Sequence, residues 1–142
     1  MRISEILRSK GNEVATIEPN AKVRVLLALL AERNIGAVVV STDGSAIEGI
    51  VSERDVVRRL NERGAALLDA EVASIMTESV RTCTPGDNVE DLRATMTEHR
   101  IRHLPVVRDG ALVGIVSIGD VVKSAIAELE TEREQLVDYI SR

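Results

Sequence analysis

The chain has 142 residues, a length typical of one domain, and 44% of them are apolar, which is enough for a hydrophobic core. One Tyr and no Phe or Trp leave an aliphatic core and argue against the aromatic platforms on which single-stranded nucleic acids stack. The net charge of −5 disfavours, without excluding, a protein that binds many phosphates along a duplex.

Targeting signals are not evident in this sequence. The first eight residues lack the apolar run of a signal peptide, and no stretch approaches the ~18 uninterrupted apolar residues of a membrane-spanning helix. The single cysteine, Cys83, has no partner for an intramolecular disulfide. A cytoplasmic location is therefore expected.

The sequence repeats itself, and such a repeat determines how the rest is interpreted. Residues 49–57, GIVSERDVV, return as residues 114–122, GIVSIGDVV, with seven of nine positions identical at an offset of 65. Other segments match at an offset of 66, namely 16–23 with 82–89 and 43–44 with 109–110. The change of offset places one extra residue in a loop of the first copy, where insertions are best tolerated.

The first copy begins with a short apolar strand before Pro19. Asn20 is the expected N-cap of a helix whose apolar residues recur at helical spacing, at Val23, Leu26, Leu27 and Leu30. The β-branched run 37–40 predicts a strand, the Asp-Gly pair at 43–44 a turn, and 47–52 a second strand of a hairpin. A second helix is predicted from Glu53, and residues 63–69, with Gly64 as the helix stop, link the copies.

The second copy predicts the same order of elements. A strand precedes Pro85, Asp87 is the expected N-cap, strands 104–107 and 112–117 flank the turn at 109–110, and a helix begins near Ile118. A single repeat of this size would be only marginally stable if it folded alone. Because its strands are apolar throughout, the two copies are expected to pack sheet to sheet as one module with approximate two-fold symmetry.

The C-terminal segment, residues 120–142, lacks Pro and Gly and predicts one long helix. Its apolar residues follow a heptad-like spacing that Arg133 interrupts, at Val122, Ile126, Leu129, Leu136 and Ile140. This stripe is consistent with packing on the chain's own domain or with a helical contact to a partner.

The predicted fold class is α/β, with two tandem β-α-β-β-α repeats related by a pseudo-two-fold axis and a long C-terminal helix. The first repeat is assigned to residues 1–62, the linker to 63–71, the second repeat to 72–125 and the helical extension to 126–142.

The Gly-Ile-Val-Ser-x-x-Asp motif has two interpretations. In the structural one, Ser52 and Ser117 cap the following helices, and Asp55 and Asp120 complete the capping arrangement, which the helix dipole favours. In the functional one, the carboxylates face a cleft and accept protons from the vicinal hydroxyls of a ribose, as in dinucleotide-binding folds. Duplication does not decide between them, since a structural cap would also be copied.

The whole chain, over roughly residues 3–125, resembles the paired cystathionine-β-synthase-type (CBS) domain module, also called the Bateman module. The resemblance is carried by residues 49–55 and 114–120, by Leu104-Pro-Val-Val107, and by the helix-leading Pro19 and Pro85. It implies clefts between the copies that bind AMP, ADP, ATP, S-adenosylmethionine or NAD(H). It further implies that the ribose ligands are Asp55 and Asp120, with Ser52 and Ser117 beside them.

The other parts of such a ligand need their own contacts. Adenine requires an apolar slot with backbone groups at its edge, and the candidates are Thr16, Ile35, Gly36, Ala37, Thr82, Ile101, Leu104 and Pro105. Gly36 would let a flat ring approach the backbone closely. Phosphate requires cations, and the candidates are Arg54, Arg102 and His103. The alternative interpretations are ordinary core for the aliphatic residues, which is the commoner role of any single one, and a structural histidine for His103.

Catalytic and metal-binding signals are weak. Cys83 has no base near it in sequence, the two histidines have no pattern of further ligands around them, and there is no phosphate loop of the GxxxxGK[ST] type. An adenine nucleotide is the expected ligand, AMP first, with ATP, ADP or NAD(H) as alternatives and no metal. The expected function is a nucleotide sensor, without enzymatic activity, that acts on a separate protein; the alternative is a dimerisation or adaptor domain with non-functional clefts.

A homodimer is also expected, because the first helices of the two copies differ on one face. Val25 and Leu29 correspond to Asp91 and Thr95, so only the first copy presents an additional apolar stripe. The stripe is either covered by residues 3–7 or paired with a second copy of the chain.

Overall fold

The computed structural model describes residues 1–11 and 13–141. Its elements follow in the order α1 (Ile3–Lys10), β1 (Thr16–Ile17), α2 (Val23–Arg33), β2 (Ala37–Val40), β3 (Gly49–Ser52), α3 (Glu53–Arg63), the 3-10 helices η1 (Gly64–Asp69) and η2 (Val72–Ser74), α4 (Val89–His99), β4 (His103–Arg108), β5 (Ala111–Ser117) and α5 (Ile118–Ser141).

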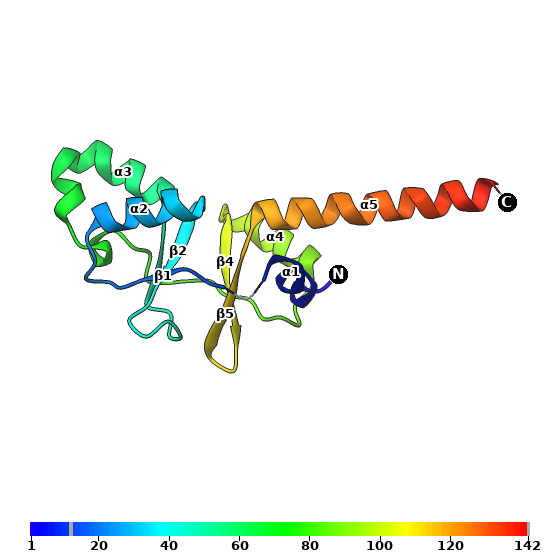
Figure 1. The fold of residues 1–142 in the computed structure, drawn as a ribbon, viewed down its shortest axis with the longest axis horizontal. Coiled ribbons are helices and arrows are strands. Elements are labelled where there is room, and N and C mark those ends of the chain that lie inside the picture. Colours follow the sequence, from blue (N-terminus) through cyan, green and yellow to red (C-terminus); the bar gives the residue numbers. More distant parts are fainter. Residues whose placement is uncertain (12, 142) are drawn as a thin grey trace.

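The two repeats form two halves that lie side by side (Figure 1). In the first half, β1 pairs in parallel with β2, and β2 pairs antiparallel with β3, under helices α2 and α3. In the second half, β4 and β5 form an antiparallel pair beside α1 and α4. The fold is therefore α/β, with two tandem β-α-β-β-α repeats and a long C-terminal helix, as the sequence predicts.

The first strand of the second repeat is reduced to one residue. Cys83 donates its backbone N–H to the carbonyl of Pro105 and accepts from the N–H of Val107, which makes a single parallel bridge. The next rung would require an N–H from residue 105, and proline has none. The equivalent position in the first repeat is Val39, and there β1 forms two rungs.

The hairpins of the two halves end differently. β4 and β5 are joined by a two-residue turn in which Asp109 and Gly110 both have positive φ, 51° and 79°, as a type I′ turn requires. In the first half the strands stop at Val40 and Gly49, and residues 41–48 form a longer loop. Asp43 orders this loop, because its Oδ1 accepts hydrogen bonds from the N–H groups of Ser45 and Ala46, and these bonds lower the Asp43 pKa.

The predicted N-caps of the first helices are wrong. Helix α2 follows Lys22, which makes no side-chain cap, and Asn20 lies in the preceding turn. Helix α4 is capped by Asn88, whose side-chain oxygen accepts from the N–H of Glu90 at 2.8 Å. Asp87 instead accepts from the N–H of Thr84 and closes the turn before the helix.

Each half has its own hydrophobic core. The first core consists of Ile17, Val23, Leu26, Leu30, Val38, Val40, Val51, Val56, Leu67, Val72 and Ile75. The second core consists of Ile3, Ile6, Leu7, Cys83, Val89, Leu92, Met96, Leu104, Val106, Val116 and Val121. The opening segment of each repeat thus packs on the other half, since α1 contributes to the second core and η2 to the first.

Because α1 packs on the second half, it does not cover the apolar stripe of α2. Val25 is 53% exposed, whereas Leu29 is half-buried against the first core. The interpretation in which residues 3–7 cover this stripe is therefore wrong, and Val25 remains the exposed part of it.

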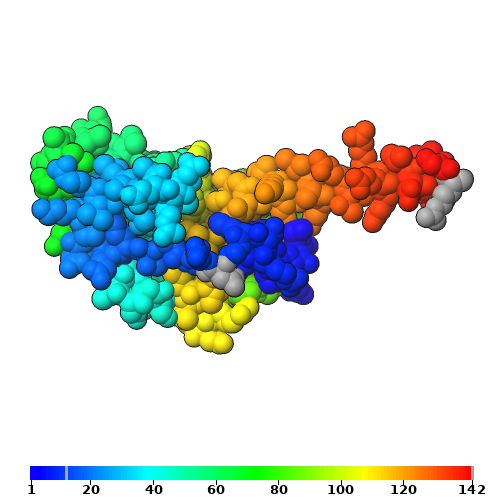
Figure 2. Space-filling view, in the orientation of Figure 1, coloured from blue at the N-terminus to red at the C-terminus, as the bar shows by residue number. Residues whose placement is uncertain are grey.

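Helix α5 packs on the body only along its first part. Val121 and Ser124 are buried, but residues 129–141 are all exposed, and the helix projects beyond the body (Figure 2). Packing on its own domain is therefore excluded for the outer part, where the exposed apolar residues are Leu129, Leu136, Val137, Tyr139 and Ile140. The predicted end of this helix, Arg142, lies outside the described residues. None of the described helices has the length and apolar character of a membrane span.

Candidate functional site

A cleft of about 750 Å³ opens between the two halves, and we call it the first cleft. The first half contributes Gly36, Ala37, Ile50, Ser52, Glu53, Arg54, Asp55, Val57 and Arg58. The inter-repeat segment contributes Thr77, Ser79, Val80 and Arg81, and the second half contributes His99, Arg100, Ile101, Arg102 and His103. Its walls therefore come from both repeats, as is common for small-molecule sites.

The first Ser-x-x-Asp motif caps α3 and faces this cleft. Asp55 Oδ2 accepts from the Ser52 N–H at 2.8 Å and from the Ser52 hydroxyl at 3.0 Å. The Asp55 N–H donates to Ser52 Oγ at 3.4 Å, which completes a capping box. Within the described residues the two bonds that the Asp55 carboxylate accepts both end on Oδ2, so the capping role leaves Oδ1 available to accept hydroxyl protons from a ligand.

Gly36 lies between residues of the two halves at this cleft. A Cβ added at Gly36 would lie 3.3 Å from Glu53 Oε1 and 3.5 Å from His103 Cε1. Burial lowers the pKa of His103, and Lys10 and Arg102 lower it further against the opposing charges of Glu53 and Asp120. His103 is therefore neutral at pH 7 and can take up a proton when negative charge enters the cleft.

The first cleft is strongly basic although the chain is acidic. Its lining holds five arginines against two carboxylates, Glu53 and Asp55, whereas the whole chain has a net charge of −5. Within the described residues none of these arginines forms an ion pair with a carboxylate; they are Arg54, Arg58, Arg81, Arg100 and Arg102. A site with unpaired guanidinium groups is suited to an anion with several oxygens.

Arg100 occupies a backbone conformation that arginine rarely adopts. Its φ is 54°, in the left-handed region, at the end of α4. The matching position at the end of α2 is Asn34, a residue that tolerates this region better, with φ of 52°. This is the left-handed conformation of a helix C-cap, in which the Arg100 N–H donates to the Met96 carbonyl, and Arg100 is among the residues that line the cleft.

The structure brings together eight of the residues that the sequence singles out. They are Gly36, Ala37, Ser52, Arg54, Asp55, Ile101, Arg102 and His103. The remaining candidates are absent from this lining: Thr16, Ile35, Thr82, Leu104, Pro105, Ser117 and Asp120. Leu104 is 1% exposed in the second core and Pro105 is buried, while Ile35 packs against the first core.

Asp120 lies in a different environment from Asp55. Its Oδ2 accepts from the Ser117 N–H at 2.9 Å and from Lys10 Nζ at 2.8 Å, and Lys10 also donates to the carbonyl of Ile115 at 2.8 Å. Burial alone would raise the Asp120 pKa, but these bonds and the positive charge of Lys10 outweigh it, so the pKa lies below its usual value.

Sequence reasoning missed the inter-repeat part of the lining. Residues 77–81 lie outside the repeated motifs, and their shape is set by a bridge between Thr77 and Ile50 that appears only in three dimensions. Arg58 and Val57 could have been found, because they lie three and two residues after Asp55, on the turn that follows it in α3. His99, to which the sequence assigns no role, also lines the cleft.

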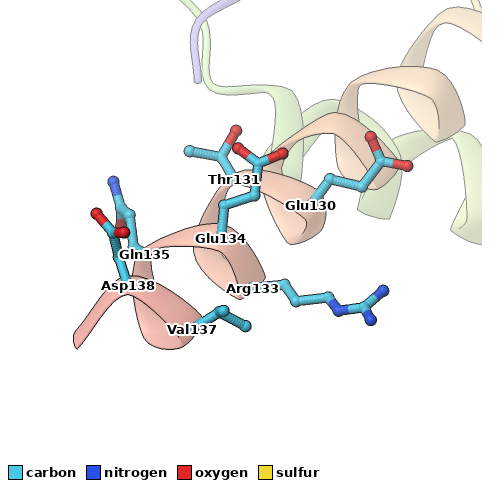
Figure 3. Close-up of a pocket in the computed structure, with 7 residues that line it drawn as sticks. All are labelled: Glu130, Thr131, Arg133, Glu134, Gln135, Val137 and Asp138. Carbon is cyan, nitrogen blue, oxygen red and sulfur yellow. The ribbon is translucent and has the colours of Figure 1, made fainter. Parts of the chain in front are cut away.

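A second concave surface lies along the outer part of α5 (Figure 3). Its seven lining residues all come from this one helix, and their side chains project from several sides of it: Glu130, Thr131, Arg133, Glu134, Gln135, Val137 and Asp138. Because one helix provides no opposing wall, this surface does not enclose a ligand.

The described part of the chain gives little support for a metal site or for a reactive cysteine. Residues 1–11 and 13–141 hold no group of three or more His, Cys, Asp or Glu side chains placed to bind a metal ion. Cys83 is 6% exposed, and burial, with the nearby Asp87, raises its pKa to about 12. Its thiol therefore stays protonated and is a poor nucleophile.

Comparison with known proteins matches this architecture. The CBS domain model matches residues 3–62 and 72–127. The chain is 35% identical to "CBS domain-containing protein CBSX3, mitochondrial" of Arabidopsis thaliana, across 97% of this chain and 71% of that protein. The crystal structure of a CBS-domain containing protein from Agrobacterium tumefaciens has a TM-score of 0.85 and 39% identity, and the match covers 88% of this chain and 99% of that one.

A third comparison concerns the fold alone. The CBS domain pair of protein MJ0100, solved in complex with 5′-methylthioadenosine and S-adenosyl-L-methionine, is 22% identical with a TM-score of 0.79. The match covers 90% of this chain and 98% of that chain.

Proposed function

Because this chain belongs to the CBS-domain family and carries two CBS domains in tandem, we propose that it is a regulatory module that binds an adenine nucleotide in the first cleft. A partner protein then responds to the change in packing between the two halves. The nucleotides of the cytoplasm would be the signal, and the chain itself would catalyse no reaction.

The excess of arginine in the first cleft carries this proposal. In this cleft Asp55 accepts from the ribose hydroxyls, while the arginines and His103 contact the phosphates. Adenine lies in the slot formed by Gly36, Ala37 and Ile101. A hydrogen bond to a charged group contributes about 1.5–3 kcal/mol, so affinity should rise with the number of phosphates, in the order adenosine, AMP, ATP. The adenosine derivatives bound by the MJ0100 pair support the same ligand class.

We also propose a homodimer. Val25 on α2, Val57 and Leu60 on α3, and Val122 and Ile126 on α5 are each at least 45% exposed. Exposed apolar side chains on several helices are typical of a contact surface, and a symmetric pair is the commonest assembly. This observation also favours the alternative role, a dimerisation domain, for which binding in the cleft is not needed.

Titration calorimetry of the purified chain with adenosine, AMP and ATP tests the proposed ligand. We expect ATP to bind at least tenfold more tightly than adenosine, because adenosine makes no contact with the arginines. Added NaCl should lower the affinity for ATP and leave the affinity for adenosine unchanged, since salt screens only the charged contacts. Absence of binding by all three compounds to the folded protein would leave the dimerisation role as the better account.

A further inference from the structure

The outer part of α5, residues 129–141, is exposed along its whole length and projects beyond the body (Figure 2). Leu129, Leu136 and Ile140 follow one another at spacings of seven and four residues, so they share one face of the helix. They are 64%, 62% and 79% exposed. An apolar helix face is stabilised by packing against another surface, so this segment is suited to a partner.

The same segment is acidic. Residues 129–141 hold three glutamates and one aspartate against one arginine. At about 100° per residue, Glu132 flanks the apolar stripe on one side, and Glu130 and Glu134 lie on the other. None of these glutamates forms an ion pair with another described residue. A basic and apolar partner surface is therefore favoured, whereas a second α5 would bring like charges together.

The first cleft and its rim provide such a surface. The lining holds five arginines that are unpaired among the described residues. Val57 also lines the cleft and is 66% exposed, and Leu60, one turn further along α3, is 45% exposed. Because Arg54 and Arg58 lie on the same turns of α3 as Val57, this helix presents apolar and basic groups side by side.

The outer part of α5 does not reach the first cleft of its own chain. Helix α5 runs away from α3 as one continuous helix (Figure 1), and after Gly119 it contains neither glycine nor proline that would bend it. A docked α5 therefore belongs to a second copy. Thirteen helical residues are about 20 Å long and about 10 Å wide, which exceeds the cleft volume of about 750 Å³. The helix thus lies across the mouth of the cleft and inserts only side chains.

We propose that the outer part of α5 docks across the mouth of the first cleft of a second copy of the chain, and that nucleotide phosphates compete with it for the same arginines. Its leucines pack on the apolar residues of α3, and its glutamates face Arg54 and Arg58. Arg133, which interrupts the apolar stripe, contacts Glu53 of the cleft. The competition rests on the proposed function of the first cleft, and it makes nucleotide binding change the assembly of the protein.

Sedimentation velocity of the full chain, with and without ATP, tests this inference. Wild type should self-associate, and saturating ATP should raise the dissociation constant of the assembly by at least about tenfold. Glu130→Lys with Glu134→Lys should weaken self-association by at least about tenfold, while ATP binds as tightly as in wild type or more tightly. The matched control, Glu13→Lys with Glu18→Lys, changes two exposed glutamates outside α5 and the cleft lining and should assemble as wild type does.

A second variant locates the other side of the contact. Arg54→Glu with Arg58→Glu should weaken self-association as strongly as the reversal in α5. Mixing this α3 variant with the Glu130→Lys, Glu134→Lys variant should restore association, because one contact then has its native charges and the other has both charges reversed. If the α3 variant associates as wild type does, or if the two folded variants do not associate when mixed, the docking of α5 on the cleft is wrong.

The outcomes separate this inference from the proposed function. If calorimetry shows that ATP binds but the self-association of wild type is unchanged by ATP, the competition is wrong and the nucleotide site stands. If ATP does not bind to the folded chain, the proposed function fails and the competition fails with it, while the mixed variants still decide whether α5 docks on the cleft. A wild-type chain that stays monomeric at the highest measurable concentration contradicts the inference outright.

Discussion

The two Ser-x-x-Asp motifs share the same two backbone capping bonds but have opposite surroundings. Asp55 faces a cleft with five arginines, and Asp120 is bound by a lysine of the chain's own first helix. The first motif is therefore open to an external ligand, while the second is satisfied internally. A repeated motif fixes a local fold, but the residues contributed by the other repeat and by the segments between them decide what the site can bind.

The largest difference between the two motifs should follow from charge. Replacing Arg81 and Arg102 together by glutamate removes two cations from the first cleft and adds two repelling charges. We expect ATP affinity to fall by at least a hundredfold, because each charge-assisted contact contributes about 1.5–3 kcal/mol. The matched control replaces Arg93 and Arg108, which lie outside that lining, by glutamate. Calorimetry that shows equal losses in both double variants would contradict a local role for Arg81 and Arg102.

Gly49 and Gly114, which begin the repeated motif in the two copies, should differ in how well they tolerate substitution by alanine. A Cβ at Gly49 would lie 2.9 Å from the backbone oxygen of Thr77, which is fixed by hydrogen bonds to Ile50, and 2.7 Å from Met76 Sδ. At Gly114 the nearest atoms belong to the end of the flexible Leu7 side chain.

We therefore expect Gly49→Ala to lower the free energy of unfolding by about 2–3 kcal/mol and Gly114→Ala by about 1 kcal/mol. Urea unfolding followed by circular dichroism measures both values. A greater loss for Gly114→Ala would show that α1 is held more rigidly than the segment after η2.

Arg100 offers a test in which stability and binding change in opposite directions. Arg100→Asn places at the end of α4 the residue that the first repeat has at Asn34, where φ is also positive. The free energy of unfolding should rise by up to about 1 kcal/mol, because asparagine tolerates the left-handed region better than arginine. ATP affinity should fall severalfold with the loss of a cation. A variant that binds ATP as wild type does would show that this arginine has no role in the cleft.

The smallest expected effect concerns pH. Burial and the charges of Lys10 and Arg102 hold the His103 pKa below its usual value of 6.5, despite Glu53 and Asp120. Phosphate near His103 would raise that pKa in the complex, so ATP binding should take up a proton and tighten as the pH falls between the two values. We expect a change of a few fold between pH 7.5 and 6.0 relative to His103→Gln, which corrects for protonation of ATP itself. Equal pH dependence in both proteins would exclude a contact between His103 and phosphate.

Much of the fold could be predicted from the repeat, because strand, turn and helix signals occur twice at nearly one offset. The starts of α3 and α5 at Glu53 and Ile118 and the turn at Asp109–Gly110 agree with the sequence. The helix starts after Pro19 and Pro85 were misplaced, since several polar residues there could serve as caps.

The site could be predicted only in part. The motif identified Ser52 and Asp55, and the family resemblance identified Arg102 and His103, which the structure places around one cleft. The resemblance could not show that α1 crosses to the second half, because that packing joins segments more than 100 residues apart, such as Lys10 and Asp120. Nor could it show that Leu104 and Pro105 are buried, since aliphatic strand residues suit a core and an adenine slot equally well.

The matched variants Asp55→Ala and Asp120→Ala, titrated with ATP by calorimetry, test most directly whether the first cleft alone is the nucleotide site. The account predicts that Asp55→Ala lowers the affinity for ATP by about tenfold or more, the loss expected for a charge-assisted contact to ribose. It also predicts that Asp120→Ala changes the affinity for ATP by less than about twofold. Equal weakening by both substitutions, or a larger effect of Asp120→Ala with the fold intact, would contradict it.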